Sequence, residues 1–327
     1  MRRVVCREFA SLDHLSIEDV PEREPGAGEV VISVRAAGVN FVDSLIVQGR
    51  YQIKPPLPCT PGSEVSGEVL AVGDAVGDGV GGIAVGDRVL ATTGFGAFAE
   101  QVVVPSTSVV PIPEGMTFGQ AATFPQSYST ALYTLTRRAG LVADEWVLVL
   151  GGGGGIGLAT VDVARALGAH VIAAASSEDK LAAARLVGAE GAIAYESEDL
   201  KVRARELSGG GVDVVVDPVG GAQAEPALRA LRWGGRFMVV GFASGEIPPL
   251  PINQVLLNSR AVVGVDWGAW TFRNPQDQRQ LLGEVLAMAA GGGLHPVEPV
   301  AYPLNHAAQA LSDLEERKVT GKAILVP

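Results

Sequence analysis

The chain is poor in cysteine, histidine and aromatic residues. Its 327 residues include two cysteines and four histidines, and Phe, Tyr and Trp together make up 6% of the composition. Cys6 and Cys59 lie far apart in the sequence and form no Cys-x-x-Cys pair, and the histidines have no ligand spacing. These counts exclude a disulfide framework and argue against a metal site. We interpret both cysteines as small apolar fillers.

Basic charge and long apolar runs are also scarce. The 36 acidic and 25 basic residues give a formal net charge of −11, with no Lys or Arg block that would attract a phosphate polymer. No apolar run is long enough to span a bilayer, and residues 1–8 carry charge without a following apolar segment. We therefore expect a soluble, cytoplasmic protein that binds neither nucleic acid nor a membrane.

Glycine, in contrast, is abundant at 42 residues, and 47% of the chain is hydrophobic, which favours an α/β protein with tight turns. The length is comfortable for two domains. Up to about residue 110, short β-rich runs predict a small, mostly antiparallel barrel; they lie at 30–34, 65–69, 88–91 and 99–104. The glycine-rich stretch 73–82 predicts a flexible surface loop.

Beyond Pro113 apolar strands alternate with amphipathic helices. The expected strands are 146–150, 170–175, 191–194, 212–217, 236–241 and 261–265. The expected helices are 156–167, 179–186, 200–207, 222–231, 276–290 and 305–317. Six strands with intervening helices predict a doubly wound parallel sheet. We expect a Rossmann domain at 123–265 and a discontinuous catalytic domain at 1–122 and 266–327, with the closing strand 322–326 returning to it.

A glycine-rich turn follows the first of these strands. It contains Gly-x-Gly-x-x-Gly at Gly152, Gly154 and Gly157, with Gly155 and Ile156 between them. Glycines allow the chain to turn sharply and to approach a pyrophosphate, and the helix that follows offers free N–H groups. The strand before and the helix after supply the context that a dinucleotide site needs. A glycine-rich turn without a ligand is the alternative.

The end of the second strand bears on which dinucleotide binds. An NAD enzyme typically carries an acidic residue there, whereas this chain has Ala175 followed by Ser176, and Lys180 lies one helical turn further on. A hydroxyl and an ammonium can bind a 2′-phosphate, so we expect NADPH. Glu178 and Asp179 could repel that phosphate, or could be solvated residues of a first helical turn. Lys180 as an ordinary surface lysine is a further alternative.

Together with this loop, several short motifs resemble the medium-chain dehydrogenase/reductase superfamily, and within it the zinc-free quinone oxidoreductases that include zeta-crystallin. They are Asn-Phe-Val-Asp at 40–43, Gly-Arg-Tyr at 49–51, Pro-Gly-Ser-Glu at 61–64, Gly-Asp-Arg-Val at 86–89, Gly-Ala-Phe-Ala-Glu at 96–100, Asp-Pro-Val-Gly at 217–220 and Thr-Gly-Lys at 320–322. The resemblance covers essentially the whole chain. It implies a GroES-like β-barrel catalytic domain beside the Rossmann domain.

Zinc-using relatives carry two Cys and one His at positions that correspond here to Asn40, Ser63 and Gln126. No thiolate or imidazole ligand set remains. The cysteine-rich lobe of those relatives would fall between residues 89 and 97, where this chain has only a short Thr-Gly connection. We expect no metal.

The resemblance also implies the site residues. Those expected near the nicotinamide are Asn40, Tyr51 and Thr130. Those expected around the adenosine phosphate are Lys180, Tyr195 and Arg317, although Tyr195 could simply cap a strand and Arg317 could pair with Glu315 or Glu316. We further expect cofactor contacts from Asp217, Gly241 and Phe242. Leu45 stands where the family often has a second tyrosine, which makes the pocket more apolar.

These features predict hydride transfer from NADPH to a quinone or related conjugated carbonyl, with the cofactor carrying the chemistry and the protein orienting it. An alkenal or enoyl-thioester reductase needs the same cofactor site and is the nearest alternative. A second alternative is an NADPH-binding protein without turnover, of the crystallin kind. The resemblance also implies a homodimer, which could form through the edge strand near 261–265.

Overall fold

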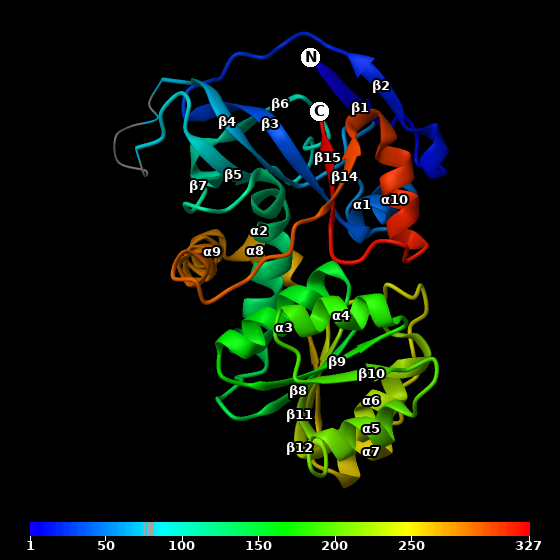
Figure 1. Ribbon diagram of the computed structural model, residues 1–327. Helices are drawn as coiled ribbons and strands as arrows, with labels where there is room; N and C mark the ends of the chain where they lie inside the picture. Colours follow the sequence, from blue (N-terminus) through cyan, green and yellow to red (C-terminus); the bar gives the residue numbers. More distant parts are fainter. Residues whose placement is uncertain (75, 77–81) are drawn as a thin grey trace. The chain divides into compact units, whose positions relative to one another are not determined.

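The computed structural model describes residues 1–74, 76 and 82–327, and these form two compact units (Figure 1). The first unit consists of Met1–Gln126 and Glu298–Pro327, and the second of Ser127–Val297. Most of the stretch 73–82, which the sequence predicts to be a flexible loop, lies outside the described residues.

The second unit is built on a six-stranded, fully parallel sheet. Its strands are β8 (Trp146–Leu150), β9 (His170–Ala175), β10 (Gly191–Ala194), β11 (Val212–Asp217), β12 (Leu231–Val239) and β13 (Ala261–Gly264). Their order across the sheet is β10-β9-β8-β11-β12-β13, the order of a doubly wound dinucleotide-binding fold. Strands β8 and β9 inside the sheet are buried on both faces beyond their first residue, so they appear in the sequence as apolar runs. The predicted parallel sheet is confirmed.

Helices cover both faces of this sheet. The helical segments of the unit are the π-helical η3 (Tyr133–Arg138), α3 (Gly155–Ala166), α4 (Glu178–Leu186), α5 (Leu200–Leu207), η4 (Gly221–Gln223), α6 (Ala224–Ala230), α7 (Ile252–Leu257), α8 (Trp267–Arg273) and α9 (Pro275–Ala290). Figure 1 shows α3 and α4 on one face and α5 and α6 on the other. Their apolar sides close a core that includes Leu148, Ile172 and Phe237.

One strand begins earlier than the sequence predicts. β12 starts at Leu231 instead of 236, and its register against β11 shifts between the pairs Val212/Leu231 and Val214/Arg236. Gly234 and Gly235 lie in this irregular stretch. Because glycines carry no side chain, they interrupt the apolar pattern that would have revealed the start of the strand.

The first unit contains a mostly antiparallel sheet. The strands of this unit are β1 (Arg2–Val5), β2 (Ser16–Asp19), β3 (Glu29–Val39), β4 (Glu64–Val72), β5 (Arg88–Thr92), β6 (Gln101–Pro105), β7 (Val109–Pro111), β14 (Val300–Pro303) and β15 (Ala323–Val326). Seven of them form the main sheet, in which the order β14-β15-β3-β4-β5-β7 is joined by β6, which pairs with β3. Strands β1 and β2 pair with each other in a separate sheet. Only the β14–β15 pair is parallel among the described strands of this unit. The C-terminal strand β15 pairs with β3, so the last segment of the chain returns to the sheet of the first unit.

Short helices complete this unit. They are η1 (Leu12–His14), α1 (Phe41–Val47), η2 (Ser106–Ser108), the first part of α2 (Phe118–Leu132), η5 (Leu304–His306) and α10 (Ala307–Glu315). In the part of the chain that the structure describes, every helix is too short or too polar to cross a bilayer.

The compact units and the predicted domains divide the chain differently. Helices α8 and α9 fall in the second unit, whereas the sequence prediction assigns residues 266–327 to the catalytic domain. Within the second unit, the ring of Trp270 lies 4.5 Å from that of Tyr133, and Arg137 forms an ion pair with Glu284 at 2.9 Å. The two units are defined by packing within the folded chain and not by independent folding. The predicted domain limits therefore stay a prediction.

The two cysteines are neighbours in space. Cys6 and Cys59 form an antiparallel bridge in which each backbone N–H donates to the other's carbonyl, at 2.8 and 2.9 Å. Burial raises the pKa of both thiols, that of Cys59 to about 11. Low thiolate content fits the interpretation of both as apolar fillers, but their pairing could not be read from a separation of 53 positions.

Candidate functional site

The glycine-rich turn connects β8 to α3 in the second unit. Gly151 has a φ of 59°, which reverses the chain after β8, and Gly154 is the N-cap of α3. The N–H of Gly152 donates to the Ala174 carbonyl at 2.9 Å, which ties the turn to β9. The first N–H groups of any helix lack intrahelical acceptors. The N–H groups of Gly155, Ile156 and Gly157 are therefore available to an anion, with the positive end of the helix dipole behind them.

The three motif glycines meet different surroundings. A Cβ on Gly152 would lie 2.8 Å from the Ala173 Cβ, and one on Gly157 would lie 2.0 Å from the Gly151 carbonyl oxygen. A Cβ on Gly154 would meet only the Gly151 oxygen, at 3.4 Å. The first and third glycines are thus required by packing, whereas the second leaves its space open. This arrangement fits a pyrophosphate that approaches the backbone at Gly154.

Lys180 lies against the same turn. A Cβ on Gly153 would be 2.4 Å from the Lys180 Cβ, so only glycine permits this approach. Ser176 follows β9 directly and is half-buried, as is Lys180. Glu178 forms an ion pair with Arg185 on the exposed side of α4, which agrees with its interpretation as a solvated residue. The structure thus brings Lys180 to the glycine-rich turn.

The remaining predicted cofactor residues of this unit follow other strands of the sheet. Asp217 ends β11; its Oδ1 accepts the N–H groups of Val219 and Gly220, both at 2.8 Å, and burial raises its pKa. Its carbonyl oxygen accepts the N–H of Gly241 at 3.3 Å. Carboxyl ends of parallel strands share one edge of a sheet, where such folds bind their ligands. Asp217 therefore closes a turn at that edge with one of its oxygens.

Phe242 and Tyr195 lie near this edge as well. A Cβ on Gly220 would be 2.8 Å from Cδ1 of Phe242, so the ring packs on the turn that Asp217 closes. Tyr195 follows β10, and its N–H donates to the Ala175 carbonyl at 3.3 Å. It lines a cavity of about 430 Å³ with residues at the beginnings of α5 and α6, among them their N-caps Asp199 and Gln223.

In the first unit, Asn40 belongs to a buried polar network. Its Nδ2 donates to Glu64 Oε1 at 2.9 Å, and its Oδ1 accepts from the ammonium of Lys322. Lys322 also contacts Glu64 Oε1 at 3.1 Å. Asn40 is the N-cap of α1, and its backbone N–H donates to Asp43 Oδ2 at 2.8 Å. Two fixed charges therefore hold the amide of Asn40.

Ser63 and Gln126 lie beside this network. Ser63 Oγ donates to Gln126 Oε1 at 3.1 Å, and the Gln126 N–H donates to Glu64 Oε2 at 2.9 Å. The three positions at which zinc-using relatives carry ligands thus hold two amides and a hydroxyl that are already hydrogen-bonded. Zinc prefers thiolate and imidazole, and the neighbouring ammonium would repel a cation. Within the described ranges no group of three His, Cys, Asp or Glu could hold a metal ion. These residues do not fit zinc.

Three other predicted residues are located more simply. Tyr51 is half-buried in the first unit, two residues beyond Gly49, whose φ is 67°. Thr130 belongs to α2 in the second unit; it is buried, and its carbonyl accepts Thr134 Oγ1 at 2.6 Å. Arg317 is exposed in the first unit and ends α10 with a φ of 58°.

Glu315 accepts Gln48 Nε2 at 2.8 Å, and Glu316 pairs with Lys318 at 2.5 Å. These contacts do not decide between a pairing of Arg317 with either carboxylate and its predicted role at the phosphate.

Sequence reasoning missed the roles of Glu64 and Lys322. Glu64 and Lys322 belong to the Pro-Gly-Ser-Glu and Thr-Gly-Lys motifs. These motifs supported the family resemblance, but neither residue was given a role in the site. The one available signal was that these motifs contain charged residues beside apolar strands. Their contact spans 258 positions, so no local pattern could pair them.

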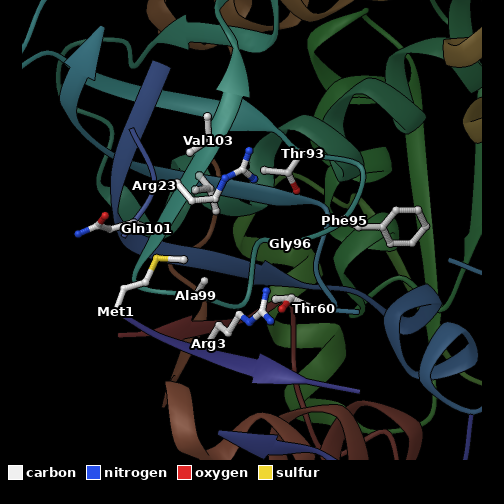
Figure 2. A pocket seen from close by; sticks show the side chains of 11 residues that line it. Met1, Arg3, Arg23, Thr60, Thr93, Phe95, Gly96, Ala99, Gln101 and Val103 are labelled. Carbon is white, nitrogen blue, oxygen red and sulfur yellow. The ribbon is translucent and has the colours of Figure 1, made fainter. Parts of the chain in front are cut away.

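A separate cavity of about 150 Å³ in the first unit is shown in Figure 2. The guanidinium groups of Arg3 and Arg23 extend toward it from two segments, near Thr60 and Thr93. None of the predicted site residues lines it.

Asp43 makes stability depend on pH. Burial raises the pKa of its carboxyl from an ordinary 3.8 to about 7, against the lowering effects of the Asn40 and Gly62 N–H groups and of Lys322. The folded state thus binds the proton more tightly than the unfolded chain, so the free energy of unfolding falls as pH rises from about 4 to about 7. The asparagine in the variant Asp43→Asn does not titrate, so the variant should not lose stability in this way. The free energy of unfolding of the variant minus that of wild type should therefore increase between about pH 5 and about pH 8, as measured by urea unfolding.

Asp87→Asn is the matched control, since Asp87 also accepts a backbone N–H, from Ala84 at 2.7 Å, but is accessible to solvent. Parallel stability profiles of Asp43→Asn and wild type would contradict the assignment.

Comparisons with known proteins agree with this architecture. Residues 26–114 match the family model of the alcohol dehydrogenase GroES-like domain, and residues 155–287 match that of the zinc-binding dehydrogenases. A quinone oxidoreductase-like protein 2 homolog of Nematostella vectensis is 38% identical over 99% of this chain and 88% of its own length.

Two solved structures extend the likeness to three dimensions. A quinone oxidoreductase of Pseudomonas syringae pv. tomato DC3000 is 32% identical, with a TM-score of 0.89 over 100% of this chain and 99% of that chain. A quinone oxidoreductase of Escherichia coli, solved in complex with NADPH, is 28% identical, with a TM-score of 0.87 over the full length of both chains. The GroES-like and Rossmann architecture predicted from the sequence is confirmed, and the chain belongs to the quinone oxidoreductase branch of the medium-chain dehydrogenase/reductase superfamily.

Proposed function

We propose that this protein is an NADPH-dependent oxidoreductase that reduces a quinone or a related conjugated carbonyl without a metal. The observation that carries the proposal is the turn at Gly152–Gly157, where the second glycine leaves room for a pyrophosphate and Lys180 lies alongside. Membership of the family supports it, as does the NADPH bound to the Escherichia coli relative. NADPH supplies a hydride when bound.

The chain's own residues bind and orient the reactants. The helix N–H groups after Gly154 bind the pyrophosphate. Ser176 and Lys180 bind the 2′-phosphate, and we assign further contacts there to Tyr195 and Arg317. Asp217, Gly241 and Phe242 are proposed to contact the dinucleotide along the strand ends.

At the acceptor, Asn40, Tyr51 and Thr130 are proposed to donate hydrogen bonds to the carbonyl oxygen. Such donors polarise a carbonyl more weakly than a metal ion does. A delocalised acceptor needs less polarisation, so quinones and enals are favoured over simple ketones and alcohols. Leu45 leaves the pocket apolar, which suits a quinone ring.

A panel of acceptors tests this proposal. NADPH oxidation is followed with a naphthoquinone, a medium-chain enal and a crotonyl thioester as acceptors. A secondary alcohol is tested in the reverse direction, by reduction of NAD. We expect the naphthoquinone to react fastest and a chelator to have no effect. Reduction of the enal or thioester without the quinone would favour the double-bond reductase. Tight NADPH binding without turnover of any acceptor would favour a crystallin-like role.

Lys180→Ala tests the choice of cofactor. Removal of a charge-assisted contact to the 2′-phosphate should raise the NADPH dissociation constant at least about tenfold. NADH lacks that phosphate, so its dissociation constant should stay nearly unchanged and serves as the internal control. Both constants can be measured by fluorescence titration. Equal losses for the two cofactors would refute the assigned role.

We also propose a homodimer formed through β13. This strand pairs only with β12, which leaves one edge open in the described structure. Large apolar side chains near that edge are exposed: Trp233 at 73%, Leu256 at 79% and Val262 at 42%. Exposed large apolar side chains favour an interface in this region, and a two-fold axis would pair the two edges.

Val262→Lys should weaken the dimer, because a charge would be buried at the centre of the interface. Sedimentation at graded protein concentrations measures the effect, with Val142→Lys, at an exposed valine outside this patch, as the control. A concentration-independent monomer of the wild-type chain would contradict the proposed dimer.

A further inference from the structure

Lys322 carries a nearly buried positive charge. Its side chain is 12% exposed, and its partner Glu64 is 1% exposed. Removing an ammonium and a carboxylate from water costs several kcal/mol per ion, which their mutual attraction offsets only when the geometry is good and other hydrogen bonds are made. Apolar residues would fill the same space at less cost. The pair is therefore an expensive feature of the core and calls for a reason beyond packing.

The charges determine the orientation of the Asn40 amide. An ammonium only donates hydrogen bonds and a carboxylate only accepts them. Asn40 must therefore present Oδ1 to Lys322 and an Nδ2 hydrogen to Glu64, as the structure has it. Rotation of the amide by a half turn would set donor against donor and acceptor against acceptor. Glu64 takes one of the two Nδ2 hydrogens, which leaves the other in a defined direction.

The surroundings hold this arrangement rigid. The second oxygen of Glu64 accepts the Gln126 N–H at 2.9 Å. A Cβ on Gly38 would lie 2.7 Å from Glu64 Oε1, so glycine is needed for the carboxylate to occupy its place. The backbone of Asn40 is fixed in turn by Asp43. A donor fixed in advance stabilises developing charge without a reorganisation cost.

We propose that Lys322 is a positioning residue that does the work of the missing metal: it locks the Asn40 amide so that the free Nδ2–H donates to the acceptor's carbonyl oxygen, and it adds positive charge behind that donor. The inference rests on the proposed function in that it takes Asn40 as the donor to the acceptor. Its chemical basis is the disagreement between the zinc-binding family and this chain. At the positions of the zinc ligands, Asn40 contacts both members of an ammonium–carboxylate pair, Gln126 donates its backbone N–H to the carboxylate, and Ser63 donates to Gln126.

A purely structural role of Lys322, as a link between β15 and the α1 region, is the competing explanation. Lys322→Met alone would leave Glu64 as an uncompensated buried charge and could unfold the chain. The double variant Lys322→Met/Glu64→Gln removes both charges of the pair together, so that neither is left without its partner, and it is therefore the variant to test. Lys318→Met is the control, because Lys318 is a nearby lysine that is 58% exposed and pairs only with Asp313 and Glu316 among the described residues.

Two measurements separate the explanations. In the double variant, kcat for a naphthoquinone should fall about 10- to 100-fold while the NADPH dissociation constant and the melting temperature stay close to those of wild type. The side-chain amide resonances of Asn40, identified by their loss in Asn40→Ala, should shift and exchange-broaden in the double variant of the cofactor-free protein. Lys318→Met should change neither kcat nor the Asn40 amide resonances. Unchanged Asn40 resonances, or an unchanged kcat in a folded double variant, would overturn the proposal.

The resonance measurement needs no acceptor, so it distinguishes the two hypotheses. Suppose that wild type reduces no acceptor, while the Asn40 amide resonances still shift and broaden in the double variant. The proposed function then fails, but Lys322 does orient the Asn40 amide, and the group that binds this amide is a ligand other than a reducible carbonyl. If wild type reduces the quinone but the amide does not respond, the proposed function stands and the inference fails.

Discussion

Gly154→Ala should fold as stably as wild type and lose NADPH affinity on the order of 100-fold. The residue has a φ of −88°, which alanine adopts easily, and the new methyl group would meet the Gly151 oxygen at 3.4 Å, an ordinary van der Waals contact. The protein therefore tolerates the change. A bound pyrophosphate would not, because the methyl group occupies the space through which it reaches the backbone. Calorimetric titration with NADPH and a thermal melt measure the two quantities.

Two other glycines supply controls for this variant. Gly157→Ala would place a methyl group 2.0 Å from a backbone oxygen, so it should lower the melting temperature as well as the affinity. Gly283→Ala lies in α9 with open space around it and should leave affinity unchanged while slightly stabilising the helix. If Gly154→Ala binds NADPH with wild-type affinity, the pyrophosphate does not bind at this turn.

Asn40→Ala should have the second large effect. Loss of one preorganised donor to a developing oxyanion typically costs about 100- to 1000-fold in kcat. The ion pair of Lys322 with Glu64 remains in this variant, so the core keeps its charge balance. The change in affinity for NADPH should be small, because the glycine-rich turn is untouched. Steady-state kinetics with a naphthoquinone, together with the NADPH titration, test both statements.

Asn305→Ala, at an exposed asparagine of the same unit, is the comparison for Asn40→Ala. A fall of kcat in proportion to lost folded protein would assign Asn40 a structural role only. An unchanged kcat would remove it from the site.

The parallel sheet was predictable because its strands are short apolar stretches that alternate with helices. Trp146–Leu150 is a continuous apolar run, Val212–Asp217 is apolar apart from its two aspartates, and the predicted and observed bounds of both strands coincide. The glycine-rich turn was predictable for a related reason, since strand, turn and helix are contiguous in the sequence. Where glycines interrupt the pattern, as at Gly234 and Gly235, the bounds were missed.

The polar network of the first unit could not be predicted in the same way. Asn40, Glu64 and Lys322 come from an N-cap, a strand and the approach to the last strand, and only the pairing of β3 with β4 and β15 brings these segments together. The sequence contained each residue within a family motif but held no information on which charges meet. Cys6 and Cys59 illustrate the same limit, because a bridge between distant segments leaves no local periodicity.

Single-turnover oxidation of NADPH by a naphthoquinone shows whether this protein transfers a hydride to a conjugated acceptor without a metal. With enzyme in excess over NADPH, we expect rapid loss of NADPH absorbance on addition of the quinone, slower loss when NADPH carries deuterium at the transferred position, and no response to a chelator. Absence of oxidation by any conjugated acceptor, together with chelator-sensitive oxidation of an alcohol by NAD, would contradict the proposed function.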